Sequence, residues 1–213
     1  MADPEEHDEQ GVRRLVGFTD GVVAIAITLI VLPLVDAARD LGTKPAIDFL
    51  SDNGFNLLAA GLSFVVIALF WMDHHRLYRR VSGATAPLIR ANLVWLAAIV
   101  FLPLPTVLIV DSPGHDPIAE GLYIGTVLVA QVAIRAQELI IVRERLVPSA
   151  AEVPAGLLWR DWIVVGLVAA ALVVTLSVPA AGLYPLLLAV FARPLGRLAR
   201  RNQPAAADAE RLL

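Results

Sequence analysis

Long apolar blocks divided by short polar segments dominate this chain. They cover residues 15–35, 56–72, 91–110, 119–134, 157–178 and 181–192. A helix of about 20 apolar residues crosses the hydrocarbon core of a bilayer. The sixth block reaches this length only if it continues through Arg193 and Pro194, with the arginine extending to the headgroups. We therefore expect an all-α polytopic membrane protein with six transmembrane helices per subunit.

Composition excludes most other classes of protein. The mean hydropathy is +0.72 and only 17% of the residues are charged, against about a quarter in soluble domains. A net charge of −3 gives no basic field for nucleic acid, so we expect no nucleic-acid partner. The absence of cysteine from the sequence excludes disulfides and thiolate chemistry.

Basic residues gather on one predicted side of the membrane. With six spans, fifteen of the 17 Lys and Arg residues fall on the side of both termini, and Arg39 and Lys44 fall on the other. Because basic residues near span ends stay in the cytoplasm, we predict cytoplasmic termini and the plasma membrane as location. The predicted organisation is an acidic cytoplasmic tail at 1–12, short and disordered, a transmembrane domain at 13–199 and a cytoplasmic tail at 200–213. The acidic start does not resemble a signal peptide, so the first helix is expected to be retained.

The first predicted helix carries a distinct stripe of residues. At about 100° per residue, positions 21, 25, 28 and 32 share one face, and position 29 lies beside them. Asp20 points about 140° away from Ile25, toward neighbouring helices. The stripe consists of Gly21, Ile25, Thr28 and Leu32, with Leu29 at its edge.

Asp20 lies about one turn inside the membrane, where an ionised carboxylate needs donors. The second predicted helix ends in FWMDHHRLYRR on the same side. Trp71, His74 and His75 therefore reach a depth at which they face Asp20 or Arg14. Indole and imidazole N–H groups both donate to carboxylates, and Asn92 early in the third helix is a further candidate.

The start of the first helix matches a family signature. Arg14, Phe18, Thr19 and Asp20 fit R-x-x-x-F-[S/T]-D, and GVVAIAITLIVL fits the apolar continuation G-x-x-A-I-A-I-T-L-x-V-L. With FWMDHHRLYRR and NLVWLAAIVFLPLPT, the chain resembles the bacterial branch of the transmembrane protein 175 family. These are potassium channels whose animal members act in endosomes and lysosomes. Thr19 stands where serine is usual and keeps the hydroxyl.

The resemblance implies a homotetramer in which the first helix of each subunit lines a central pore. It places the hydrophobic constriction at Ile25 and Leu32, with Leu29 beside them, and links Thr28 to the preference for potassium. From their depth and donor groups, we expect Trp71, His74, His75 and Asn92 to form a structural clasp with the signature residues Arg14, Phe18, Thr19 and Asp20. No TVGYG-type filter occurs in the sequence. We expect membrane lipid and monovalent cations as partners, and no cofactor beyond permeant potassium ions.

Other functions are also compatible with the sequence. The stripe on the first helix is also compatible with plain helix packing. Asp20 and His74 could form the relay of a proton-coupled transporter, although the chain has no inverted repeat. A non-conducting membrane scaffold is the third possibility. An enzyme is not expected, because Asp73, His74 and His75 lie at a helix end without a nucleophile beside them.

Three smaller expectations concern polar and small residues. Adjacent His74 and His75 diverge by about 100° on a helix and do not form a chelating pair, so no metal site is predicted. His115, in DSPGHDP, is expected to be a solvated loop residue. Small residues predict close helix packing at Ser63, Gly61, Gly125, Gly166 and Gly182.

Overall fold

A computed structural model describes residues 4–43, 45–112, 114–147 and 155–187. Within these ranges the chain is helical and contains no strand. The elements are α1 (Pro4–Arg39), α2 (Ala46–Asp52), α3 (Gly54–Tyr78), α4 (Ala86–Phe101), α5 (Pro103–Asp111), α6 (Pro117–Arg143), α7 (Ala155–Ser177) and the 3₁₀ helix η1 (Pro179–Ala181).

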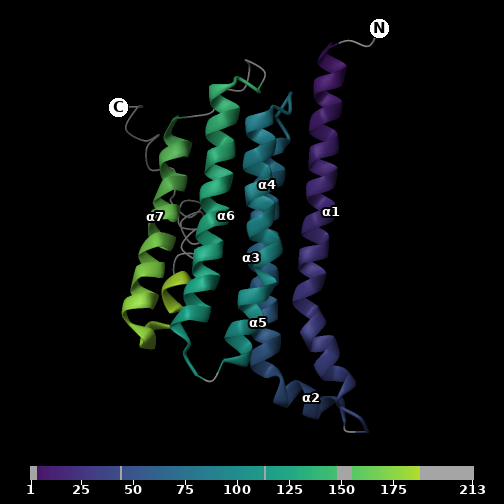
Figure 1. Cartoon of the computed structure of the whole chain (residues 1–213), viewed down its shortest axis with the longest axis vertical. Helices are drawn as coiled ribbons and strands as arrows, with labels where there is room; N and C mark the ends of the chain where they lie inside the picture. The colour runs from purple at the N-terminus through teal and green to yellow at the C-terminus, as the bar shows by residue number, and fades with distance from the viewer. Residues whose placement is uncertain (1–3, 44, 113, 148–154, 188–213) are drawn as a thin grey trace, which may run out of the picture.

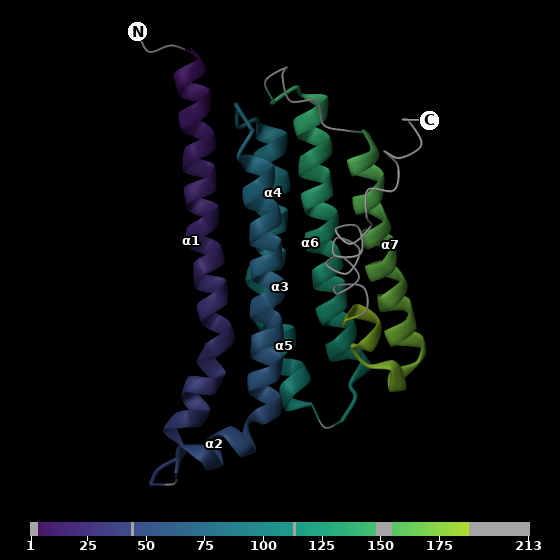
Figure 2. The same ribbon diagram turned by 180° about the vertical axis from the view of Figure 1, so that it is seen from behind.

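The long helices lie side by side along one axis (Figures 1 and 2). α1 and α7 form the two outer sides, α3, α4 and α6 lie between them, and α2 crosses the lower end. α4 packs against α6, α6 against α7, and α1 against both α3 and α4. The start of α1, the end of α3 and the end of α6 share the upper end, where most arginines of these helices lie.

Four described segments are long and apolar enough to cross a membrane. They are Glu9–Arg39, Gly54–Tyr78, Ala86–Asp111 and Pro117–Arg143. The apolar part of α7, Trp162–Ser177, is shorter. The predicted sixth span at 181–192 coincides in part with η1 and a turn at Gly182, and residues 188–192 lie outside the described ranges, as do Arg193, Pro194 and the tail at 200–213. The count of six therefore stays a prediction.

The acidic N-terminus is helical where we expected disorder. α1 begins at Pro4 and continues without interruption into the apolar block. A proline suits the first helical position because its missing N–H has no partner there. The acidic residues that follow also favour the positive end of the helix dipole.

The third span is divided near its C-terminal end by proline. Pro103 and Pro105 have no N–H to donate within the helix, and α4 ends at Phe101. The Leu102 N–H is shared between the carbonyls of Ala98 and Ile99, at 3.2 and 3.3 Å, and the Thr106 hydroxyl donates to the Leu102 carbonyl at 2.9 Å. The sequence-based boundaries did not predict this break, nor α2 in the first loop.

Two helices approach each other closely at a glycine that we did not predict. A Cβ atom added at Gly121 on α6 would lie 2.7 Å from Leu176 Cδ2 on α7. Among the described residues of one subunit, a Cβ at Gly61, Gly125 or Gly166 would meet no atom within 4 Å, so close packing is not found there. Gly182, with φ +52, does lie against the His115 ring.

We predict that Gly121→Leu destabilises the α6–α7 contact by about 1–3 kcal/mol, because the added side chain must displace Leu176. Thermal unfolding of the detergent-solubilised protein measures the effect. Gly125→Leu is the matched control, one turn away on the same helix with open space around it. Equal melting temperatures for the two variants would contradict the prediction.

Candidate functional site

The first helix has two faces that serve different surroundings. Its inner face packs into the bundle and consists of Thr19, Val23, Ala26 and Ile30, all nearly inaccessible. Each residue of the predicted stripe follows a residue of the inner face by two positions. Two positions correspond to a rotation of about 200°, so the stripe lies on the opposite side of the helix. That stripe is exposed in the subunit, with Ile25 60% and Leu32 49% accessible, and Leu29 beside it 39% accessible. The stripe is therefore available for contacts outside its own subunit.

The one hydroxyl of the stripe is held in a fixed orientation. Thr28 Oγ1 donates to the carbonyl oxygen of Ile25 at 2.7 Å. Since its hydrogen is used within the helix, the lone pairs of this oxygen stay available on the exposed face. Thr28 thus presents an acceptor one turn beyond an exposed isoleucine.

Asp20 is bound by the second span. The Trp71 indole N–H donates to Asp20 Oδ1 at 2.8 Å, and the His75 ring stacks on Trp71 with the centroids 5.4 Å apart. This contact joins α1 to α3. It gives the carboxylate a donor that water would otherwise supply.

A second connection runs through buried amide and hydroxyl groups. Asn92 Nδ2 donates to Thr19 Oγ1 at 2.9 Å, and Asn92 Oδ1 lies 2.9 Å from His74 Nε2. Because the amide nitrogen already donates to Thr19, the amide oxygen accepts from the imidazole N–H. The His74 ring is stacked between Tyr78 and Trp95, at centroid distances of 4.2 and 4.7 Å. This series of contacts joins three helices, α1, α3 and α4.

His74 therefore differs from its expected role, since its Nε2 bonds to Asn92 and Asp20 is held by Trp71. Three positions apart on α3, Trp71 and His74 point in directions about 60° apart, so each reaches a different partner. Arg14 and Phe18, the remaining signature residues, are exposed on α1.

Several buried polar contacts were not predicted. Within the bundle, Tyr78 donates to Gln137 at 2.9 Å, and Ser63 lies within 2.8 Å of Thr106 and 3.3 Å of Tyr123. His115 is exposed in its loop, as expected, and also bonds to buried Glu120 at 3.0 Å. In the sequence, such contacts are indicated only by a polar residue, such as tyrosine or glutamate, within an apolar block. Its presence does not identify the hydrogen-bond partner.

The described part of the chain offers no catalytic or metal-binding cluster. No group of three or more His, Asp or Glu side chains capable of holding a metal was found among the described residues. The exposed stripe holds aliphatic side chains and one hydroxyl, which can repel water or contact an ion but cannot break a bond.

Known proteins are similar to this chain in sequence. The family model "Endosomal/lysosomal potassium channel TMEM175" matches residues 14–103, which contain the stripe and both connections. A potassium channel of Chamaesiphon minutus is 32% identical over 131 residues, covering 60% of this chain and 64% of its own length. A potassium channel of Streptomyces collinus is 31% identical over 103 residues, covering 48% of this chain and 50% of its own length. Over these residues the chain is similar to members of the TMEM175 family.

The fold agrees with this similarity. The crystal structure of a lysosomal potassium-selective channel TMEM175 homolog from Chamaesiphon minutus aligns with a TM-score of 0.66 at 23% identity, over 84% of this chain and 95% of that one. An endosomal/lysosomal proton channel TMEM175 of Gallus gallus is 35% identical over 151 residues, covering 64% of this chain but 30% of its own length. The chain thus spans less than two thirds of the length of these curated relatives.

The Asp20–Trp71 bond should contribute measurably to stability. We predict that Trp71→Phe lowers the free energy of unfolding by about 1–2 kcal/mol, because it removes the donor to a carboxylate while retaining an aromatic ring against His75. Trp162→Phe, on exposed α7, is the control and should have little effect. The measurement is thermal unfolding in detergent, and equal losses in both variants would show that the bond is not stabilising.

Proposed function

We propose that this protein is a potassium-preferring monovalent cation channel. Four copies form a homotetramer, and α1 of each lines a central pore. Ile25, Leu29 and Leu32 form the hydrophobic constriction, and Thr28 contributes to the preference for potassium. No cofactor is needed besides the permeant ions.

The exposed stripe on α1 is the observation that carries this proposal. Its side chains lie opposite the face that packs within the subunit, so they are available to surround a common axis. The described interior of the subunit holds large, fully buried side chains such as Trp95, Ile99 and Ile124, which disfavour a path within it. A water-filled path must therefore form between subunits. The names of the bacterial relatives, both potassium channels, support the choice of ion.

Simple physical effects account for gating and selectivity in such a pore. A ring of four isoleucine side chains excludes water when narrow and so blocks ions until the helices spread or rotate. Four Thr28 hydroxyl oxygens, already oriented by their bonds to the Ile25 carbonyls, can replace part of the hydration shell of an ion. This suits weak selection among monovalent cations better than tight binding.

The membrane orientation is part of the same proposal. The upper end of the bundle carries Arg13, Arg14, Arg76, Arg79, Arg80, Arg90, Arg143 and Arg145, and Arg39 lies toward the other end. By the distribution of positive charge, the upper end faces the cytoplasm, both termini are cytoplasmic and the plasma membrane is the location. The six-helix subunit, with spans beyond the four long described ones, completes this arrangement.

The geometry gives less support to a proton-coupled transporter. A relay between Asp20 and His74 requires groups that both accept and donate, whereas Asp20 is bound to an indole, which only donates. His74 is engaged by Asn92. A structural role for both residues fits these bonds better.

Reconstitution in liposomes with a potassium gradient tests the proposal. We expect cation flux from the wild type, and an increased leak with a weaker preference for potassium over sodium from Ile25→Asn, because a polar ring stays wet. Ion-sensitive dyes report the flux, and bi-ionic bilayer recordings report the preference.

Ile163→Asn is the matched control for this experiment. Ile163 on α7 is 60% exposed, the same fraction as Ile25, but it lies on another helix. Its substitution should leave flux unchanged. Absence of flux in the wild type would reject the channel, leaving the scaffold interpretation, and a similar leak in both variants would remove Ile25 from the constriction.

Thr28 allows a separate test of selectivity. Thr28→Val removes the hydroxyl at nearly constant volume and should reduce the preference for potassium by about fivefold, the equivalent of one weak polar contact of ~1 kcal/mol. Thr28→Ser keeps the hydroxyl and should retain most of the preference. Permeability ratios from reversal potentials measure both, and a Thr28→Val channel with unchanged ratios would exclude the hydroxyl from selection.

A further inference from the structure

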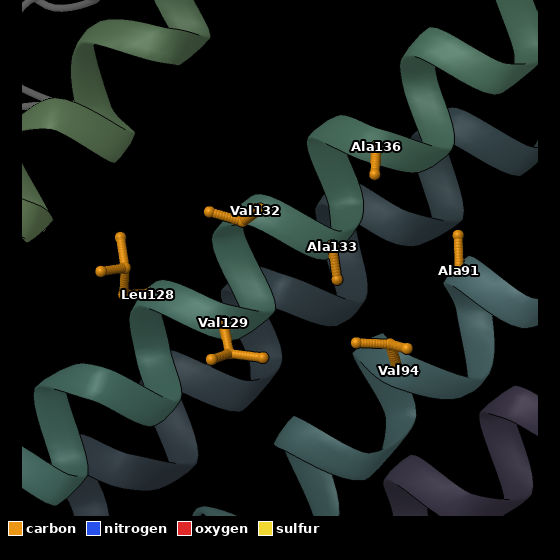
Figure 3. A pocket seen from close by; sticks show the side chains of 7 residues that line it. All are labelled: Ala91, Val94, Leu128, Val129, Val132, Ala133 and Ala136. Atoms are coloured by element: carbon orange, nitrogen blue, oxygen red, sulfur yellow. The ribbon is translucent and has the colours of Figure 1, made fainter.

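An apolar groove lies on the surface between α4 and α6. It has a volume of about 390 Å³ and is lined without any polar surface. Figure 3 shows that its side chains come from these two helices alone, with Val129, Ala133 and Ala136 of α6 on the side of Ala91 and Val94 of α4. The lining residues are Ala91 and Val94 on α4, and Leu128, Val129, Val132, Ala133 and Ala136 on α6. Small side chains at 91, 133 and 136 leave the space open.

The groove points toward arginines at the upper end of the bundle. Arg90 lies one helical turn before Val94 on α4, and Arg143 lies two turns after Ala136 on α6, so each continues a lining face. Both side chains are exposed. Among the described residues, neither is in an ion pair.

Bonds between the flanking segments fix the two arginines at the same end. The Ser82 N–H and hydroxyl both donate to the Leu146 carbonyl, at 2.8 and 2.9 Å. The Thr85 hydroxyl donates to Glu144, the carboxylate nearest in sequence to Arg143. The start of α4 is thereby held beside the end of α6, and Glu144 already has a partner.

We propose that this groove binds an acyl chain of an anionic phospholipid whose phosphate contacts Arg90 and Arg143. The lining matches a methylene chain and offers no polar group to any other ligand. The volume falls within the range of about 300–1,000 Å³ typical of small-molecule sites. Charge complementarity selects the occupant, because basic side chains between membrane helices bind anionic headgroups. A second copy of the chain would fill the groove without neutralising the two arginines.

Native mass spectrometry of the purified full-length protein tests the site. Phosphatidylglycerol and phosphatidylcholine are each added at matched concentrations, and the bound fraction is measured. The wild type should retain phosphatidylglycerol preferentially. Arg90→Gln with Arg143→Gln should weaken its retention roughly tenfold, since each arginine contributes to the attraction of an anionic headgroup. Arg79→Gln with Arg80→Gln removes equal charge just after the end of α3, which does not line the groove, and should leave retention nearly unchanged.

Filling the groove provides an independent measurement. Val129→Trp enlarges an exposed lining residue, whereas Val173→Trp enlarges an exposed residue of α7. The first should abolish preferential retention and the second should preserve it, with both variants unchanged in size-exclusion elution.

Three outcomes would overturn the proposal. Equal loss in the two arginine pairs would show only a general attraction between charged surfaces. Equal retention of both lipids by the wild type would show apolar contact alone. A change of oligomeric state in Val129→Trp would show that another copy of the chain occupies the groove.

Discussion

Polar side chains within the apolar bundle determine how the first helix is attached. In a membrane, a carboxylate, an amide and an imidazole each need a partner, because no water is available to replace one. Asp20 obtains its donor from Trp71 on α3, and Thr19 is joined through Asn92 on α4 to His74 on α3. These bonds are directional, unlike the contacts between aliphatic side chains around them. They therefore fix the rotation of α1 about its own axis.

The rotation of α1 determines which of its residues pack against the other helices and which face outward. With Thr19 turned inward, Val23, Ala26 and Ile30 pack against the core, and Ile25 and its neighbours must face outward. The remaining helices act as a support whose interior is closed by bulky side chains. The proposed conduction pathway thus depends on a junction that itself contacts no ion.

The sequence predicts elements governed by local periodicity better than contacts between helices. The spacing of Ile25, Thr28 and Leu32 follows from helical geometry alone, and Trp71 was among the donors expected for Asp20. His74 could not be assigned to Asn92 in advance, because that requires the relative rotation of two helices. The approach of Gly121 to Leu176 and the bond from His115 to Glu120 depend likewise on tertiary packing.

The two faces of α1 also limit how its length can change during evolution. Single substitutions alter one face and leave the other intact. One inserted or deleted residue between Thr19 and Ile25 would turn everything after it by about 100° relative to the junction. Ile25, Thr28 and Leu32 would then leave their face together. We therefore expect natural variation in this segment to consist of replacements, with length differences confined to the segments beyond the helix.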